Sequence, residues 1–233
     1  MGRVHRHLKT LRLACFLSLA TAGMSEAASL AVSPIRVEVL QPASSGAVTL
    51  RNESARPIVG QVRVFEWTLR DGKDHFAPTD HVIASPPIVQ IAAGSEALVR
   101  LIRIQGEPIN GEKSYRLVVD EVPDANRVRN MGVNLAIRYA LPLFFVHPDA
   151  SPSRLVWSIE NRSGRRVLVA ANSGDRSVRI SDLSIGGVKI SSGLAGYVLG
   201  RSERVFDLPR GALSAGAISA ETEKGRLNAQ VSR

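Results

Sequence analysis

The chain has 233 residues, a net charge of +9 and a single cysteine, Cys15. One cysteine excludes a fold held by internal disulfides, and a chain of this length can bury enough apolar surface without them. The cations are spread through strand-like segments without aromatic platforms or a basic helix, which argues against a nucleic-acid partner and leaves an acidic protein surface or a carboxylate ligand open.

The N-terminus has the three-part layout of a secretory signal peptide. An apolar stretch at 13–22, too short to span a bilayer, is followed by the small residues Ser25 and Ala27 at a cleavage site. A lipoprotein signal ending at Cys15 is the alternative, but Arg12 stands where an apolar residue is required. We therefore expect removal of residues 1–27, export to the periplasm and no membrane insertion, because no later apolar run reaches spanning length. The basic residues before the apolar stretch are Arg3, Arg6, Lys9 and Arg12.

Strand patterns dominate the rest of the chain. Alternating or β-branched segments recur every eight to twelve residues or so, separated by Gly, Pro, Asn, Asp and Ser, and no helical periodicity is sustained. This is typical of immunoglobulin-like sandwiches. The predicted strands lie at 37–39, 47–50, 62–67, 97–104, 115–119, 133–139, 154–159, 167–170 and 178–183.

A Pro-rich segment at 147–152 predicts a domain boundary. The sequence thus predicts an N-terminal domain at 28–147, a linker at 148–151 and a smaller domain at 152–233. The fold class is all-β, with two immunoglobulin-like sandwiches at an angle and a cleft between them, and such clefts are favoured binding sites. The polar tail at 224–233 is expected to fray.

The longest strand pattern, 132–146, ends the first domain. Val133, Leu135 and Ile137 share one face, and Pro142 confines its part of the strand to an edge or bulge. Proteins normally protect an apolar edge strand, whereas a strand-donating protein must leave one available. An ordinary core strand fits the pattern equally well.

The sequence contains no phosphate loop, nucleophile elbow or zinc-protease helix, so neither an enzyme nor a cofactor is predicted. His75, His81 and His147 match no metal-ligand spacing, and no metal site is predicted.

A series of short stretches remains to be explained: 30–37 (Leu-Ala-Val-Ser-Pro-Ile-Arg-Val), 84–89 (Ala-Ser-Pro-Pro-Ile-Val) with Gly94 and Val99-Arg100, 115–123, 171–174 (Ala-Asn-Ser-Gly) and 196–200 (Gly-Tyr-Val-Leu-Gly). These stretches resemble those of the periplasmic pilus-assembly chaperones of the chaperone–usher pathway, and they follow one another in that family's order. The resemblance covers nearly the whole chain after the signal peptide. It implies a partner that is a pilus or fimbrial subunit, an incomplete sandwich whose gap the chaperone fills with its edge strand, and an outer-membrane usher that receives the complex. Val133, Leu135 and Ile137 would be the donor side chains.

The resemblance also implies two cations that hold the subunit's C-terminal carboxylate between the domains. Arg36 matches the first by its place in the opening strand. Typical members have a lysine near the end of the donor strand, and residues 140–145 contain none. Arg138 and Arg116 are the substitutes, and Arg116 is preferred because an inward arginine on an apolar strand needs a partner. This departure and the absence of a second-domain disulfide resemble the archaic, spore-coat type of the family.

Other classes remain open at this stage. A secreted pilus or spore-coat subunit, a secreted enzyme, a carbohydrate-binding sandwich and another immunoglobulin-like binding module are the alternatives. We expect a free chaperone to be a monomer or a self-capped dimer, since an exposed apolar strand favours self-association.

Overall fold

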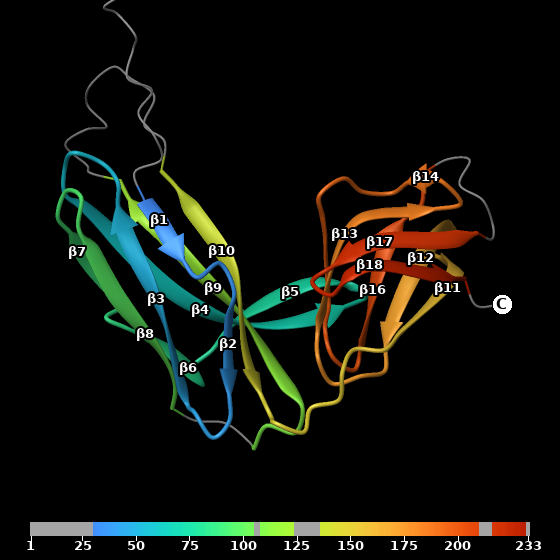
Figure 1. The fold of residues 1–233 in the computed structure, drawn as a ribbon, viewed down its shortest axis with the longest axis horizontal. Coiled ribbons are helices and arrows are strands. Elements are labelled where there is room, and N and C mark those ends of the chain that lie inside the picture. The colour runs from blue at the N-terminus through green and yellow to red at the C-terminus, as the bar shows by residue number, and fades with distance from the viewer. Residues whose placement is uncertain (1–29, 105–107, 124–135, 210–215, 232–233) are drawn as a thin grey trace, which may run out of the picture.

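The computed structural model describes residues 30–104, 108–123, 136–209 and 216–231. These residues form strands and turns but no helix, and therefore no helix that could cross a membrane. They build two β-sandwiches, seen in Figure 1 as the two lobes of a V. The prediction of an all-β chain with two sandwiches is confirmed, while the predicted signal peptide lies outside the described residues.

The first sandwich packs two sheets face to face. One has the order β1-β3-β8-β6 and the other β2-β10-β9-β4-β5, with β7 pairing with β4. The pairings are antiparallel except for β2 with β10. The strands are β1 (Leu30–Ser33), β2 (Val37–Leu40), β3 (Ser45–Asn52), β4 (Ile58–Arg70), β5 (Lys73–Pro78), β6 (Val82–Ser85), β7 (Ile88–Ile91), β8 (Glu96–Arg103), β9 (Glu112–Val122) and β10 (Arg138–Val146).

Alternation along the strands explains how this sandwich forms. On β8, Val99 and Leu101 are fully buried while Leu98 and Arg100 face outward. On β9, Leu117 and the other odd-numbered apolar residues fill the same core. Successive side chains of a strand point to opposite faces, so these two-residue periods place one row inside and the other outside.

The second sandwich is smaller and has its own core. Its sheets have the orders β11-β12-β16 and β14-β13-β17-β18, with β15 pairing with β13. Trp157 and Phe206 stack at its centre, with ring centroids 6.1 Å apart. The strands are β11 (Leu155–Arg162), β12 (Arg165–Asn172), β13 (Val178–Ile185), β14 (Val188–Lys189), β15 (Leu194–Val198), β16 (Ser202–Asp207), β17 (Ala217–Thr222) and β18 (Gly225–Gln230).

Each sandwich uses one buried asparagine to hold a loop. Asn52 ends β3 and donates through Nδ2 to the carbonyl oxygens of Arg56 (2.6 Å) and Ile91 (3.0 Å). Asn172 ends β12 and donates to the carbonyl oxygens of Arg176 (2.8 Å) and Leu199 (3.1 Å). A buried amide must satisfy its hydrogen bonds, so each side chain fixes the backbone that follows it.

Two sequence-based expectations were wrong. As far as residue 231 the tail is ordered, because β18 pairs along its length with β17 and Val231 forms a bridge with Trp157. Of the strand predicted at 133–139, residues 136 and 137 are not in a strand and β10 begins at Arg138, while residues 133–135 lie outside the described residues. Pairing partners determine where a strand begins, and hydrophobic alternation does not specify them.

Candidate functional site

The first half of β10 has one edge that no described strand pairs with. β10 pairs with β9 throughout, but its pairing with β2 begins only at Leu143. Glu121 N–H donates to the Ile137 carbonyl (2.9 Å). Antiparallel strands alternate bonded and non-bonded pairs, so the N–H groups of Arg138 and Ala140 point away from β9 toward the open edge. Figure 1 shows this part of β10 on the side of the first lobe that faces the second.

The side chains of β10 alternate between the core and the cleft. Leu141, Leu143 and Phe145 fill the first core, and Phe144 faces the second sandwich. Ile137 is in the same phase as Leu141 and is half-buried. Together with Tyr139, which packs against the same core, it continues the core-facing row toward the predicted donor residues, of which Val133 and Leu135 lie outside the described residues.

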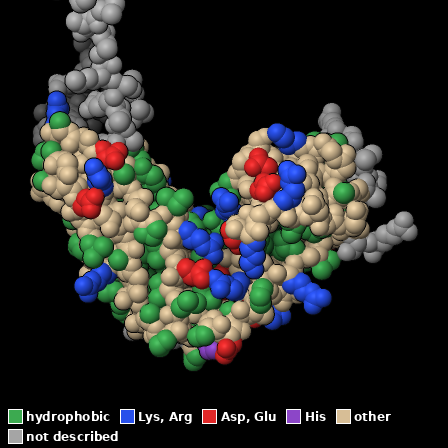
Figure 2. Space-filling model, viewed as in Figure 1, with side chains coloured by type: hydrophobic (Ala, Val, Ile, Leu, Met, Phe, Trp, Pro, Cys, Tyr) green, Lys and Arg blue, Asp and Glu red, His purple; other side chains and the backbone are tan. Residues whose placement is uncertain are grey.

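Aromatic rings from both sandwiches form the floor of the cleft. Trp67 of β4 lies 6.1 Å from Phe144 and makes an edge-on contact with Tyr197 of β15 at 5.4 Å. All three side chains are almost fully buried: Trp67 is 2%, Phe144 0% and Tyr197 7% exposed. Such ring pairs contribute about 0.5–1.5 kcal/mol each beyond their buried area. The lobes are therefore held by a packed interface, above which Figure 2 shows a hollow where basic and acidic side chains meet.

Arg36 and Arg116 both lie against this floor. The Arg36 guanidinium carbon is 4.5 Å from the centre of the Phe144 ring, and that of Arg116 is 3.8 Å from the Trp67 ring. Cation–π contacts of this kind orient a guanidinium without neutralising it. The structure thus brings these two predicted cations onto adjacent aromatic rings.

Arg116 is the less satisfied of the two. Its Nη1 donates only a long bond to the Ala140 carbonyl (3.4 Å), and its buried Nε has no hydrogen-bond partner among the described residues. Burial lowers the pKa of Arg116, although a guanidinium remains charged in proteins. A half-buried cation with unused donors favours an anionic ligand.

Arg138 is placed differently. It is exposed and pairs with Asp120, which also binds Arg63 (2.6 Å). Burial acts to raise the pKa of Asp120, but the hydrogen bonds from Arg138 and Arg63 lower it below its ordinary value. Arg138 is also four residues along β10 from Pro142, the partner of Arg116, a separation of about 13 Å at strand rise. Arg138 therefore does not lie with the other two cations.

The β4–β5 hairpin docks on the second sandwich and closes the base of the cleft (Figure 1). Val205 N–H of β16 donates to the Gly72 carbonyl (3.0 Å). Arg204 binds both oxygens of Asp74 (2.9 and 2.8 Å), and the indole N–H of Trp67 donates to Asp74 as well (2.8 Å). Burial alone would raise the pKa of Asp74, but the hydrogen bonds and charge of Arg204 lower it.

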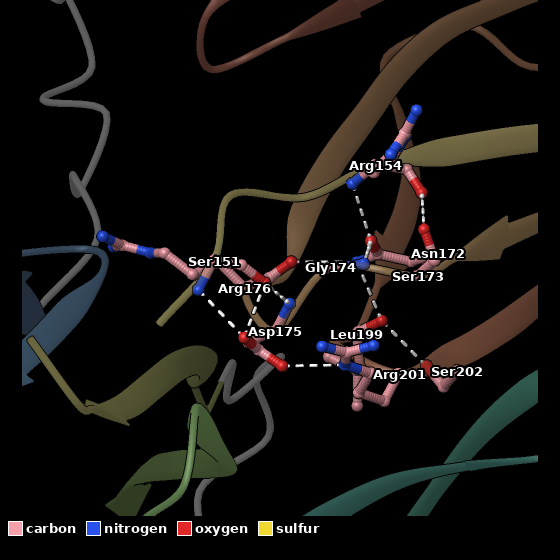
Figure 3. Close-up of polar contacts among 10 residues, drawn as sticks. All are labelled: Ser151, Arg154, Asn172, Ser173, Gly174, Asp175, Arg176, Leu199, Arg201 and Ser202. Atoms are coloured by element: carbon pink, nitrogen blue, oxygen red, sulfur yellow. Dashed lines mark hydrogen bonds and ion pairs between the residues drawn. The ribbon is translucent and has the colours of Figure 1, made fainter. Parts of the chain in front are cut away.

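The segment that joins the sandwiches is tied to the second one by Asp175. As Figure 3 shows, Asp175 accepts hydrogen bonds from Ser151 N–H (2.9 Å) and from Arg201 (2.7 Å). The hydrogen bonds from Arg201 and Ser151 hold the pKa of Asp175 well below its usual range. Asp175 lies in the loop that Asn172 holds, so the connecting segment, this loop and the cleft form one unit.

Sequence reasoning missed several residues of this site. Trp67 lies in a predicted strand, but nothing local shows that it faces a second sandwich. Arg204 is 130 residues from its partner Asp74, and Arg176 is 138 residues from its partner Glu38. Short-range periodicity carries no signal for such pairs.

A family model now connects this geometry to known proteins. The model of the pili and flagellar-assembly chaperones, PapD N-terminal domain, matches residues 29–152, more than half of the chain. The chain belongs to this family. It is a family of chaperones and not of enzymes or structural subunits, and its members have immunoglobulin-like domains. No curated protein is similar enough in sequence to count as a match.

Solved structures of pilus chaperones share the whole two-domain fold. The chain is similar to the chaperone in the CsuC–CsuE chaperone–tip adhesion subunit pre-assembly complex of the archaic Csu pili of Acinetobacter baumannii, with 26% identity and a TM-score of 0.72 over 88% of this chain and 98% of that one. The Escherichia coli chaperone DraB (21%, TM-score 0.65, 87% and 98% covered) and the Salmonella enterica SafB chaperone in complex with SafA pilin (18%, TM-score 0.67, 87% and 96%) have the same fold. The resemblance to pilus-assembly chaperones is confirmed.

Proposed function

We propose that this protein is a periplasmic chaperone that holds incomplete pilus subunits on the open edge of β10 and delivers them to an outer-membrane usher. The observation that carries the proposal is the edge of the first half of β10 that no described strand pairs with, next to a cleft whose aromatic floor carries two guanidinium groups. The Csu and Saf structures contain a chaperone together with its subunit, which supports the same kind of partner here. Removal of residues 1–27 on export belongs to this proposal.

The main chain and the side chains of β10 would contribute differently to binding a subunit. The N–H groups of the open edge would pair with the subunit's backbone, at about 0.5–1.5 kcal/mol net for each bond. Val133, Leu135 and Ile137 would enter the subunit's groove, and burying each apolar side chain contributes about 1.5–3 kcal/mol. Subunit preference would therefore be set by these side chains, and register by the main chain.

The subunit's C-terminal carboxylate would be received by Arg36 and Arg116. Both guanidinium groups lie on the aromatic floor, and Arg116 has unused donors in a half-buried position. Charge-assisted hydrogen bonds to a carboxylate are stronger than neutral ones and would fix the end of the subunit at the base of the cleft. We leave Arg138 out of this role because it lies about 13 Å along β10 from Pro142, the partner of Arg116.

Co-expression with candidate exported subunits from neighbouring genes tests the proposal. Soluble subunit that co-purifies with the chaperone is measured for the wild type, Ile137→Asp and Arg116→Ala. Leu98→Asp and Arg100→Ala are the matched controls, since both residues face outward from β8 in the opposite sheet. We expect Ile137→Asp to lower recovery by about tenfold or more, because a charge cannot enter an apolar groove, while both controls recover as much as the wild type.

Two outcomes would contradict the proposal. If the wild type recovers no subunit, the protein is not a chaperone for these partners. If Ile137→Asp recovers as much subunit as Leu98→Asp, the β10 edge is not where the subunit is held.

A further inference from the structure

A carboxylate of the chain itself already lies between two arginines in the cleft. Glu38 of β2 accepts a hydrogen bond from Arg36 through one oxygen (3.2 Å) and from Arg176 through the other. Arg36 belongs to the first sandwich and Arg176 to the second, so one carboxylate joins the two lobes. The side chains are 28% (Glu38), 29% (Arg36) and 35% (Arg176) exposed, so solvent reaches all three.

The position of Glu38 is that of the proposed anchor. Glu38 is the register partner of Phe144, and Phe144 is the ring on which Arg36 rests. Paired residues of neighbouring strands project from the same face of a sheet. The Glu38 carboxylate therefore lies on the cleft face, beside the ring that orients Arg36.

Hydrogen bonds fix the backbone of the loop that carries Arg176. Its carbonyl accepts from Asn172 (2.8 Å), and its N–H donates to the Ser151 carbonyl (3.2 Å). The N–H of the next residue, Ser177, donates to half-buried Glu112 of β9 (3.1 Å), which ties the loop to the first sandwich. In Figure 3 the Arg176 side chain extends away from the Asp175 group toward the ribbon of the first lobe. The backbone that carries the Arg176 side chain is thus fixed by hydrogen bonds that do not involve Glu38.

The surroundings can accept a second carboxylate. Arg36, Glu38 and Arg176 line a cavity of about 300 Å³ that also borders Glu223 and Lys224. Glu223 accepts a hydrogen bond from Arg179 N–H (2.9 Å) and is not among the partners of Arg36 or Arg176 in the described contacts. Two guanidinium groups offer more hydrogen-bond donors than one carboxylate can accept. An incoming carboxylate can therefore bind the unused donors, and it competes with the Glu38 carboxylate for the others.

We propose that Arg176 is a further carboxylate-binding residue of the cleft, and that Glu38 is an internal carboxylate which occupies Arg36 and Arg176 until a ligand's carboxylate displaces it. The identity of that ligand as the C-terminus of a subunit rests on the proposed function. The arrangement makes binding an exchange of one carboxylate for another. A polypeptide without a free C-terminus at this point has no carboxylate to replace that of Glu38 on the two arginines, so it binds more weakly.

The test needs no subunit. N-acetylglycine, a small mimic of a peptide's C-terminal carboxylate, is titrated into ¹⁵N-labelled wild type, Glu38→Gln, Glu38→Gln/Arg176→Ala and Glu223→Gln, with N-acetylglycinamide as the neutral control. The side-chain Nε–Hε signals of Arg36 and Arg176 are followed by NMR. We expect Glu38→Gln to bind the acid about five- to tenfold more tightly than the wild type, because two half-exposed ion pairs no longer compete. Glu223→Gln, matched in chemistry and cavity, should bind as the wild type does, and the amide should shift neither signal.

The outcomes separate the parts of the proposal. Equal affinity of wild type and Glu38→Gln overturns the displacement, and so does the absence of any saturable shift up to the solubility limit of the acid. Unchanged affinity when Arg176→Ala is added overturns the role of Arg176. Tighter binding by Glu38→Gln, combined with no subunit recovered in co-expression, would leave the carboxylate site standing and remove the chaperone function, so the two failures are distinguishable.

Discussion

A methyl group added at Gly72 should separate the two lobes. Gly72 is at the tip of the β4–β5 hairpin with φ of 71°, and its carbonyl accepts the Val205 N–H of the second sandwich. A Cβ at this position would lie 2.7 Å from the backbone nitrogen of Val205 and closer still to its side chain. Non-bonded heavy atoms need about 3.5 Å or more, so Gly72→Ala must push the hairpin away from β16.

The magnitude follows from a matched control. Gly94 has nearly the same backbone, with φ of 66°, but nothing lies within 4 Å of an added Cβ. Both substitutions carry the cost of a left-handed alanine, about 1–2 kcal/mol. Gly72→Ala also loses the bond to Val205, about 1 kcal/mol, and weakens the Asp74–Arg204 pair, which as a charge-assisted contact contributes about 1.5–3 kcal/mol. We therefore expect Gly72→Ala to lower the free energy of unfolding by about 3 kcal/mol more than Gly94→Ala.

Urea unfolding followed by circular dichroism measures this difference. Small-angle X-ray scattering of both variants measures whether the lobes move apart, and we expect an increased maximum dimension for Gly72→Ala alone. If the two variants have equal stability and the wild-type scattering profile, the hairpin does not hold the lobes together and the argument for a fixed cleft is wrong.

Two further substitutions test the charges of the cleft. Asp74→Asn should lower the free energy of unfolding at neutral pH by about 2 kcal/mol. Because the pairing with Arg204 outweighs burial and holds the folded-state pKa of Asp74 below its ordinary 3.8, this stability is present above pH 3.8 and is lost as the pH falls through the folded-state pKa. Urea unfolding should thus show the wild type and Asp74→Asn converging in acid, and a constant difference would contradict the assignment. Arg116→Leu should leave the midpoint of thermal unfolding unchanged or raised, since it replaces a half-buried cation whose Nε has no partner among the described residues. The same substitution should reduce subunit recovery. A lowered midpoint would mean that Arg116 stabilises the fold.

The elements of this protein follow from local patterns, and the comparison of expected and observed strands shows how far those patterns reach. Two-residue alternation located β3, β4, β8 and β9 within a few residues, because burial of one face is a local requirement of any sandwich strand. It failed at residues 136 and 137, just before β10, and the polar composition of the tail did not predict β18. In both places the outcome depends on which strand lies alongside. β18 is polar on its outward side, and it is ordered because β17 pairs with it.

Some residues of the candidate site could likewise be predicted from the sequence, and others could not. Arg36 and Arg116 could be named from the sequence through a family resemblance, and Arg116 through the rule that an inward cation needs a partner. Glu38 and Arg176 could not, because they meet only after two sandwiches dock. No periodicity or composition relates residues 138 positions apart.

Local sequence patterns are enough to predict that this chain forms β-sandwiches and that one of its strands has the alternation of a donor. Hydrophobic period, turn chemistry and proline placement act over a few residues and are fully present in the chain order. The packed structure adds that no described strand pairs with one edge of the first half of β10, that Trp67 and Tyr197 form one floor, and that Glu38 lies between arginines of different lobes. These are long-range contacts, made by the packing of finished sheets, and their geometry exists only once both sandwiches have formed.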